Sequence, residues 1–180
     1  MNGAIITILV IVAVGVFWYT GTYNSIKMLQ VKVKEGLSGI DVALTKRYDV
    51  LTKMLDVVKA YQKHEKEVLI EVIKLRSGMT MAERNQANRK MDEAMGQINL
   101  LAESYPELKS SNNFVELQKT IRDVEEHLQA ARRLYNSNVT AYNSKIITFP
   151  NSFVANGMGA REEEFFVADD GKRQDVQMTF

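Results

Sequence analysis

The chain has 180 residues, a formal net charge of +1, 46% hydrophobic residues and no cysteine. This charge balance argues against a nucleic-acid-binding protein, because such proteins neutralise phosphates with an excess of Lys and Arg. The absence of cysteine agrees with a reducing compartment. After the N-terminal residues, the composition is typical of one helical domain.

The N-terminal segment predicts a membrane anchor. Residues 1–26 carry no charged side chain, and Ala4–Thr20 is strongly apolar. Its Ile, Leu, Val and Phe side chains together favour membrane insertion by about 3 to 6 kcal/mol. A helix over Met1–Thr22 would be about 33 Å long, enough to cross the hydrocarbon layer. The positions predicted to face lipid are Ile5, Ile6, Ile8, Leu9, Ile11, Val12, Val16, Phe17, Trp18 and Tyr19.

The flanks of this segment favour an uncleaved anchor with a defined orientation. A cleaved signal peptide needs basic residues before the apolar run, and only Met1–Gly3 precede it here. Bulky residues at 17–19 also occupy the place where cleavage would fall. Lys27, Lys32 and Lys34 follow the span, and basic flanks stay in the cytoplasm. We therefore expect a single-pass cell-membrane protein with its N-terminus outside and its remaining chain in the cytoplasm.

A long first helix is predicted to follow directly from the anchor. Apolar residues recur at steps of three and four from Ile26, which predicts a helix from Tyr23 to Arg76. In an up-down-up bundle, a shorter second helix starting at the far end would leave the membrane-proximal stripe uncovered. An exposed apolar stripe usually marks an interface. We therefore expect homo-oligomers that pack through Ile26, Leu29, Val33 and Leu37.

Two more helices are predicted before the C-terminal tail. Thr80 and Glu83 have the spacing of a capping box that starts a helix, and Pro106 ends it. Asn113 begins a third helix with a regular apolar stripe, which Pro150 closes. The predicted fold is all-α, with a single N-terminal transmembrane helix followed by an antiparallel long-helix bundle of three to four helices.

The predicted domain organisation has three parts. Residues 1–22 form the transmembrane anchor, residues 23–150 form the helical bundle, and residues 151–180 form an acidic, mostly irregular tail. A short strand is expected in the tail around Phe165–Val167, where three apolar residues follow one another.

Ordered short motifs across the bundle resemble the LemA family. They begin with IDVALTKRYD at Ile40–Asp49 and continue to Phe149-Pro150, so the resemblance covers about Tyr23 to Pro150. The sequence departs from the family pattern at Thr52-Lys53 and around Gly157–Ala160. The motif positions are Asp41, Arg47, Tyr48, Asp49, Lys59, Tyr61, His64, Glu65, Tyr105, Pro106, Asn113, Phe114, Arg132, Tyr135, Asn136, Tyr142, Asn143, Phe149 and Pro150.

This resemblance implies a single-pass membrane protein with a cytoplasmic helical bundle and no established enzymatic activity. Association of some relatives with membrane organelle formation makes a scaffolding role plausible. Fold kinship alone does not assign a function.

The residue types themselves do not favour an enzyme. The chain has two histidines, His64 and His127, and no cysteine, so a zinc site would need an unusual carboxylate-rich ligand set. No Gly-rich phosphate loop and no Gly-x-Ser-x-Gly motif occurs. We predict no catalytic, cofactor-binding or metal-binding residue. His64 beside Glu65 leaves a phosphorelay-like bundle as an alternative.

Two groups of polar motif residues have open interpretations. Asp41, Arg47, Asp49 and Lys59 form either a buried network between helices or a solvated helix face with weak i,i+4 pairs. The Tyr-Asn pairs at 135–136 and 142–143 lie seven residues apart. We expect them to specify helix packing, because Asn beside an apolar seam discourages slipped pairings.

The function predicted from sequence is a structural, scaffolding or interaction module at the membrane, which self-associates. Its partners are membrane lipid, other copies of the chain and an unidentified membrane or cytoplasmic protein, with no nucleic acid. The alternative is a signalling adaptor or a phosphorelay-like helical bundle at the membrane.

Overall fold

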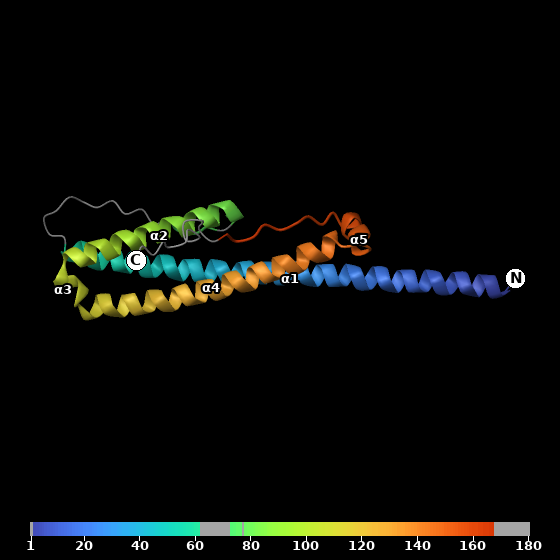
Figure 1. The fold of residues 1–180 in the computed structure, drawn as a ribbon, viewed down its shortest axis with the longest axis horizontal. Coiled ribbons are helices and arrows are strands. Elements are labelled where there is room, and N and C mark those ends of the chain that lie inside the picture. The colour runs from blue at the N-terminus through green and yellow to red at the C-terminus, as the bar shows by residue number, and fades with distance from the viewer. Residues whose placement is uncertain (1, 62–72, 77, 168–180) are drawn as a thin grey trace, which may run out of the picture. The chain divides into compact units, whose positions relative to one another are not determined.

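The computed structural model describes residues 2–61, 73–76 and 78–167. These residues form α-helices joined by turns and irregular segments, and no strand occurs among them (Figure 1). The helices are α1 (Asn2–Tyr61), α2 (Met81–Ser104), α3 (Pro106–Lys109), α4 (Asn112–Ile147) and α5 (Asn151–Gly157). The predicted fold class, a long apolar N-terminal helix followed by a helical bundle, is confirmed.

The chain divides into two compact units. The anchor unit contains Met1–Leu37 and Leu134–Glu164, and the three-helix unit contains Ser38–Arg133 and Phe165–Phe180. The first part of α1, the end of α4 and α5 therefore belong to the anchor unit. The rest of α1, the start of α4, α2 and α3 belong to the three-helix unit.

In the anchor unit, α4 packs antiparallel to α1. Gln30 Nε2 donates a hydrogen bond to Tyr142 Oη at 3.1 Å, and further along α1 Gly36 faces Tyr135. A Cβ atom at Gly36 would lie 3.0 Å from the Tyr135 Cα, closer than side chains normally approach a backbone. Glycine at this position therefore lets the two helix backbones come close together.

This packing corrects the prediction about the membrane-proximal stripe. Ile26 and Val33 are buried within the single chain, and Leu29 and Leu37 are half-buried. The expectation that this stripe lacks cover is wrong, because α4 is long enough to return along this part of α1. At about 1.5 Å per residue, α4 spans about 54 Å. A partner chain is therefore not needed to bury Ile26 and Val33.

The three-helix unit has a continuous apolar core. It is formed by one face of each of α1, α2 and α4, as the helical periodicity predicts. Its largest fully buried side chains include Ile40, Leu44, Leu51 and Met54 from α1, Met91 and Ile98 from α2, and Phe114 from α4. Leu108 from the short helix α3 is also buried.

The direction of α2 differs from the up-down-up order. Arg84 pairs with Asp41, and Arg47 pairs with Asp92, so residue numbers rise together along α1 and α2. The two helices are therefore parallel. Helix α4 runs antiparallel to α1, because Arg47 pairs with Glu125 while Gly39 lies next to Ala131.

The segment between α1 and α2 bears on this difference. The described part of α1 extends to Tyr61, and residues 73–76 are not helical, so the predicted extension of the first helix to Arg76 is wrong at those four residues. Residues 62–72 lie outside the described part of the chain. The connection from Tyr61 to Met81 is long enough to return along α1, since a chain extends by up to about 3.3–3.6 Å per residue. Helix α2 can therefore begin beside Asp41 instead of at the far end of α1.

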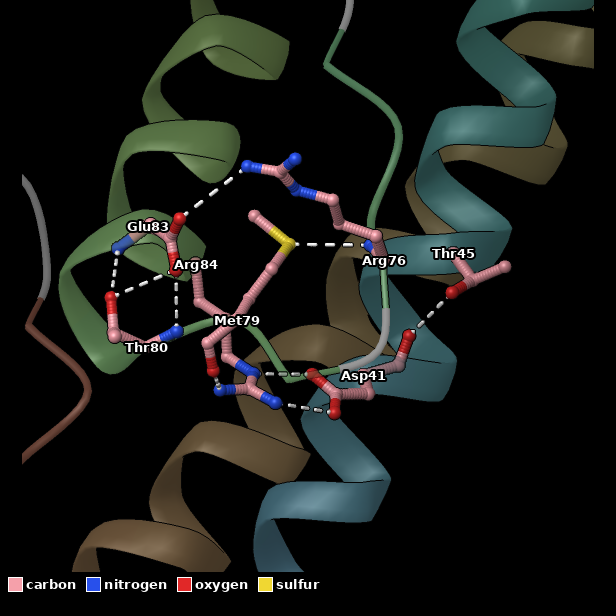
Figure 2. Close-up of polar contacts among 7 residues, drawn as sticks. All are labelled: Asp41, Thr45, Arg76, Met79, Thr80, Glu83 and Arg84. Atoms are coloured by element: carbon pink, nitrogen blue, oxygen red, sulfur yellow. Dashed lines mark hydrogen bonds and ion pairs between the residues drawn. The ribbon is translucent and has the colours of Figure 1, made fainter.

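The predicted helix boundaries after α1 are largely those of the structure. The Thr80 hydroxyl accepts a hydrogen bond from the Glu83 amide, and the Glu83 carboxylate accepts one from the Thr80 amide (Figure 2). This is the predicted capping box. Pro106 follows the end of α2 and starts α3, and Pro150 follows α4.

The tail differs from expectation in two places. Residues 151–157 form the short helix α5, which the sequence pattern does not indicate. Phe165–Val167 is irregular and not a strand, because a strand needs a partner strand to satisfy its backbone groups. Phe166 is nevertheless buried in the three-helix unit.

Candidate functional site

The N-terminal part of α1 presents an exposed apolar surface. All ten predicted lipid-facing positions are exposed, from 40% at Trp18 to 78% at Phe17. This helix is long and apolar enough to span a membrane. A surface of this size is unfavourable in water and favourable in the hydrocarbon layer of a bilayer.

Burial on α1 begins at the end of this surface. Thr22 and Ile26 are the first buried side chains of the helix. Tyr23 remains exposed, and the Lys27 ammonium lies 5.8 Å from the centre of its ring. Aromatic and basic side chains of this kind are typical of the boundary between lipid and water.

A buried charge cluster joins the helices of the three-helix unit. Arg47 is only 2% exposed, and its guanidinium reaches both neighbouring helices. Nη2 donates to Asp92 Oδ1 at 2.5 Å and Nη1 donates to Asn88 Oδ1 at 2.7 Å, while Nε lies 2.6 Å from Glu125 Oε1. Because the acidic partners come from α2 and α4, one side chain of α1 links all three helices.

Arg132 adds a second cation to this cluster. Burial lowers the pKa of Arg132, and the nearby carboxylates of Asp92 and Glu125 partly offset this effect. Its guanidinium also lies 5.3 Å from the centre of the Phe166 ring. Two arginines and two carboxylates thus nearly balance one another, as expected for a structural ion cluster.

A second ion pair fixes the start of α2 (Figure 2). Arg84 Nε lies 2.6 Å from Asp41 Oδ1, and Nη2 donates to Asp41 Oδ2 at 2.9 Å. The same guanidinium donates to the Met79 carbonyl. This two-point contact holds the first turn of α2, and the segment before it, against α1.

These contacts divide the polar group that the sequence left open. Asp41 and Arg47 belong to networks between helices, whereas Asp49 and Lys59 are exposed. The partners of Asp41 and Arg47, which are Arg84, Asp92 and Glu125, were not predicted from the sequence. The spacing of Asn88 and Asp92 on α2 was the available signal, because residues four apart share one helix face.

The tyrosines of the Tyr-Asn pairs are buried between helices as expected, whereas Asn143 has a different partner from the one expected. Asn143 donates to the Glu163 carbonyl and accepts from the Glu163 amide, both at 2.9 Å. Tyr135 Oη donates to the Glu164 carbonyl at 2.7 Å. Two motif residues of α4 therefore clamp the irregular segment that follows α5. Asn136 is half-buried in the same part of α4.

The remaining motif residues do not form one site. Tyr142 and Phe114 are buried, and Tyr48 and Tyr105 are half-buried. Tyr61, Pro106, Asn113, Phe149 and Pro150 are exposed. His64 and Glu65, on which the phosphorelay alternative depends, lie outside the described residues.

Possible metal ligands and a groove in the described part of the chain bear on the sequence prediction of no catalytic or metal-binding residue. No group of three or more His, Cys, Asp or Glu side chains among them could hold a metal ion. His127 is exposed, and its Nδ1 lies 2.7 Å from the Asp123 carbonyl oxygen on the preceding turn. An open groove of about 410 Å³ in the three-helix unit is lined by Val50, Lys53, Val57, Asn113, Glu116, Leu117 and Thr120.

The fold and these contacts define a class of protein: an N-terminal helix apolar enough to span a membrane, followed by a helical bundle held by interhelical ion pairs. Comparison with known proteins agrees with this class. The LemA family profile matches residues 36–180. Protein LemA of Metamycoplasma hominis is 30% identical over 173 residues, which cover 92% of this chain and 79% of that protein. The chain belongs to the LemA family.

A shorter similarity connects the chain to a second protein. Magnetosome protein MamQ of Magnetospirillum gryphiswaldense is 25% identical over 73 residues, which cover 41% of this chain and 27% of MamQ. This similarity covers a minor part of both proteins.

Proposed function

We propose that this LemA family member is a single-pass membrane protein whose helical bundle acts as a structural or interaction module at the membrane. The observation that supports this proposal most directly is the change in burial along α1. The ten predicted lipid-facing side chains between Ile5 and Tyr19 are exposed, whereas positions from Thr22 onward alternate between buried and exposed. One continuous helix thus combines a lipid-facing segment with a packed segment.

The proposed orientation places the bundle in the cytoplasm and the N-terminus outside the cell membrane. Lys27, Lys32 and Lys34 are exposed and follow directly after the apolar segment. Basic residues next to a span stay on the cytoplasmic side during insertion.

The polar contacts of the bundle favour a structural role over catalysis. Arg47 donates hydrogen bonds to Asn88 and Asp92 of α2, and Arg84 donates two to Asp41 of α1. Buried ion pairs of this kind can fix which helices pair and in which register. The bundle is therefore suited to presenting a defined surface at the membrane.

Self-association above the membrane is part of the proposal, but it needs a different surface from the stripe at Ile26. Met28 and Val31 are exposed, lie three residues apart and follow the apolar segment of α1. They lie on one helix face, where a second copy or another membrane protein could pack.

The topology can be tested with single cysteines, since the natural chain has none. We would compare a cysteine added before Met1 with Lys119→Cys, which is at an exposed position, in intact and lysed cells. A membrane-impermeant maleimide should label the added N-terminal cysteine in intact cells and Lys119→Cys only after lysis. The reverse pattern would contradict the orientation, and recovery of the chain in the soluble fraction would contradict the anchor.

Association can be tested by photo-crosslinking in native membranes. A photoreactive residue in place of Met28 should form an adduct with a second copy or with another membrane protein. The control places the same residue at Asp49, which is also exposed on α1. If neither position gives an adduct, association through this face of α1 is ruled out.

A further inference from the structure

The chain carries no charge from the end of α4 to just beyond α5. Residues 146–160 carry no charged side chain, and Lys145 and Arg161 border them. Ile147, Phe149 and Phe153 in this segment are 61%, 75% and 69% exposed. The rings of Phe149 and Phe153 pack edge to face, with their centres 5.8 Å apart. We call these three exposed apolar side chains, two of which are in ring contact, the apolar knob.

The opposite side of this segment is well packed. Ile146, Val154 and Ala155 are buried in the anchor unit. Helix α5 thus has one face against the unit and one face that carries Phe153 outward. The exposure of the knob does not come from a loose segment, because the residues beside it are seated in the core.

The knob lies next to the end of the proposed membrane span. A Cβ atom at Gly157 would be 4.0 Å from the hydroxyl oxygen of Tyr19 on α1. Helix α5 lies beside α1 in the same unit (Figure 1). Trp18 and Tyr19 are exposed aromatic residues of the kind that mark the boundary of a bilayer. The proximity of Gly157 to Tyr19 therefore places the end of α5 near this boundary.

We propose that the apolar knob inserts into the interfacial layer of the same bilayer that α1 spans. The anchor unit is then held by the membrane at two points, the span and the knob. A lipid surface fits better than a protein partner because the knob belongs to an uncharged segment that comes near Tyr19 of α1, and because it includes two aromatic rings. Phenylalanine and isoleucine in this layer are removed from water, which stabilises the arrangement. This inference rests on the proposed membrane span.

The test uses tryptophan fluorescence in the full chain, which has a single tryptophan, Trp18. The test variant combines Trp18→Phe with Phe153→Trp. The control combines Trp18→Phe with Leu134→Trp, since Leu134 is exposed on α4 about 20 Å before Ile147. Each protein is reconstituted into phosphatidylcholine vesicles, with or without bromine on the acyl chains. Iodide is added on both sides of the vesicle membrane.

The proposal predicts that bromolipid reduces the emission from position 153 and that iodide does not. Position 134 should show the opposite behaviour. A variant with Phe149→Trp in the Trp18→Phe background serves as a second reporter should the change at 153 disturb α5. Loss of the helical circular dichroism signal would identify such a disturbance.

The other outcomes separate this inference from the proposed span. If bromolipid quenches native Trp18 but iodide quenches the knob positions, the span holds and the inference is overturned. If neither quencher reaches the knob positions, protein covers the knob and the lipid contact is wrong. If bromolipid fails to quench native Trp18, the proposed span itself is wrong.

Discussion

Replacing Arg47 by Met should strongly destabilise the three-helix unit. The side chain of Arg47 is nearly inaccessible to water and contacts Asn88, Asp92 and Glu125. Met has a similar length and no hydrogen-bonding group, so the substitution removes the cation while keeping most of the packing volume. It leaves the two carboxylates without their main partner.

The expected loss follows from the exposure of those carboxylates. Removing one partner of a buried ion pair costs about 3–5 kcal/mol. The side chains of Asp92 and Glu125 are 26% and 35% exposed, so water can solvate them in part. Arg132 also remains beside them. We therefore expect Arg47→Met to lower the free energy of unfolding by about 2–4 kcal/mol.

The assay is urea unfolding of the full chain in detergent, monitored by the helical circular dichroism signal. Arg47→Lys keeps the charge but lacks the several N–H donors of the guanidinium group, so it should lower the free energy of unfolding by an intermediate amount. Arg122→Met is the control, because Arg122 is exposed on α4. If Arg47→Met stays within about 0.5 kcal/mol of the natural chain, as surface substitutions usually do, the cluster does not hold the helices together.

Three further predictions concern helix packing, the tail and pH. Gly36→Ala should lower the melting temperature, because the added Cβ would lie 3.0 Å from the Tyr135 Cα. Gly39→Ala should raise the melting temperature, because its Cβ has an ordinary contact with Ala131 at 3.9 Å and alanine favours the helix by about 1 kcal/mol. Equal shifts in both would refute the close approach. Asn143→Ala should release the segment after α5 and speed its cleavage in limited proteolysis; unchanged cleavage would show that the clamp is dispensable. Hydrogen bonds from Thr80, chiefly its backbone amide, lower the pKa of Glu83 below the ordinary value of 4.5. The natural chain should therefore be more stable than Glu83→Ala above pH 4.5. This difference in stability should disappear as the pH falls through the lowered pKa of Glu83, and a difference that persists in acid would contradict the assignment.

The elements of this protein that depend on local sequence could be predicted well. The uncharged N-terminal segment predicts the exposed apolar part of α1, and the spacing of Thr80 and Glu83 predicts the start of α2. Pro106 and Pro150 end helices where expected. These signals work because capping and helical periodicity involve residues only a few positions apart.

The features that involve distant residues were predicted poorly. The direction of α2 depends on the path between Tyr61 and Met81, which periodicity does not specify. Asn143 was expected to pair across helices, but it binds the backbone of Glu163. Helix α5 was missed because a helix this short has too few turns to show an apolar period.

The amino-acid sequence by itself determined that α1, α2 and α4 are long helices, that α1 begins with a part apolar enough for a bilayer, and which residues of their apolar stripes form the core. The tertiary structure alone decided that α4 covers the stripe at Ile26, that Arg47 joins three helices, and that Gly157 at the end of α5 lies near Tyr19. The physical reason is the distance along the sequence between the residues that determine each feature. Helix formation and burial pattern are set within a few turns, whereas pairing between helices depends on chain path, close packing and charge partners far apart in the sequence.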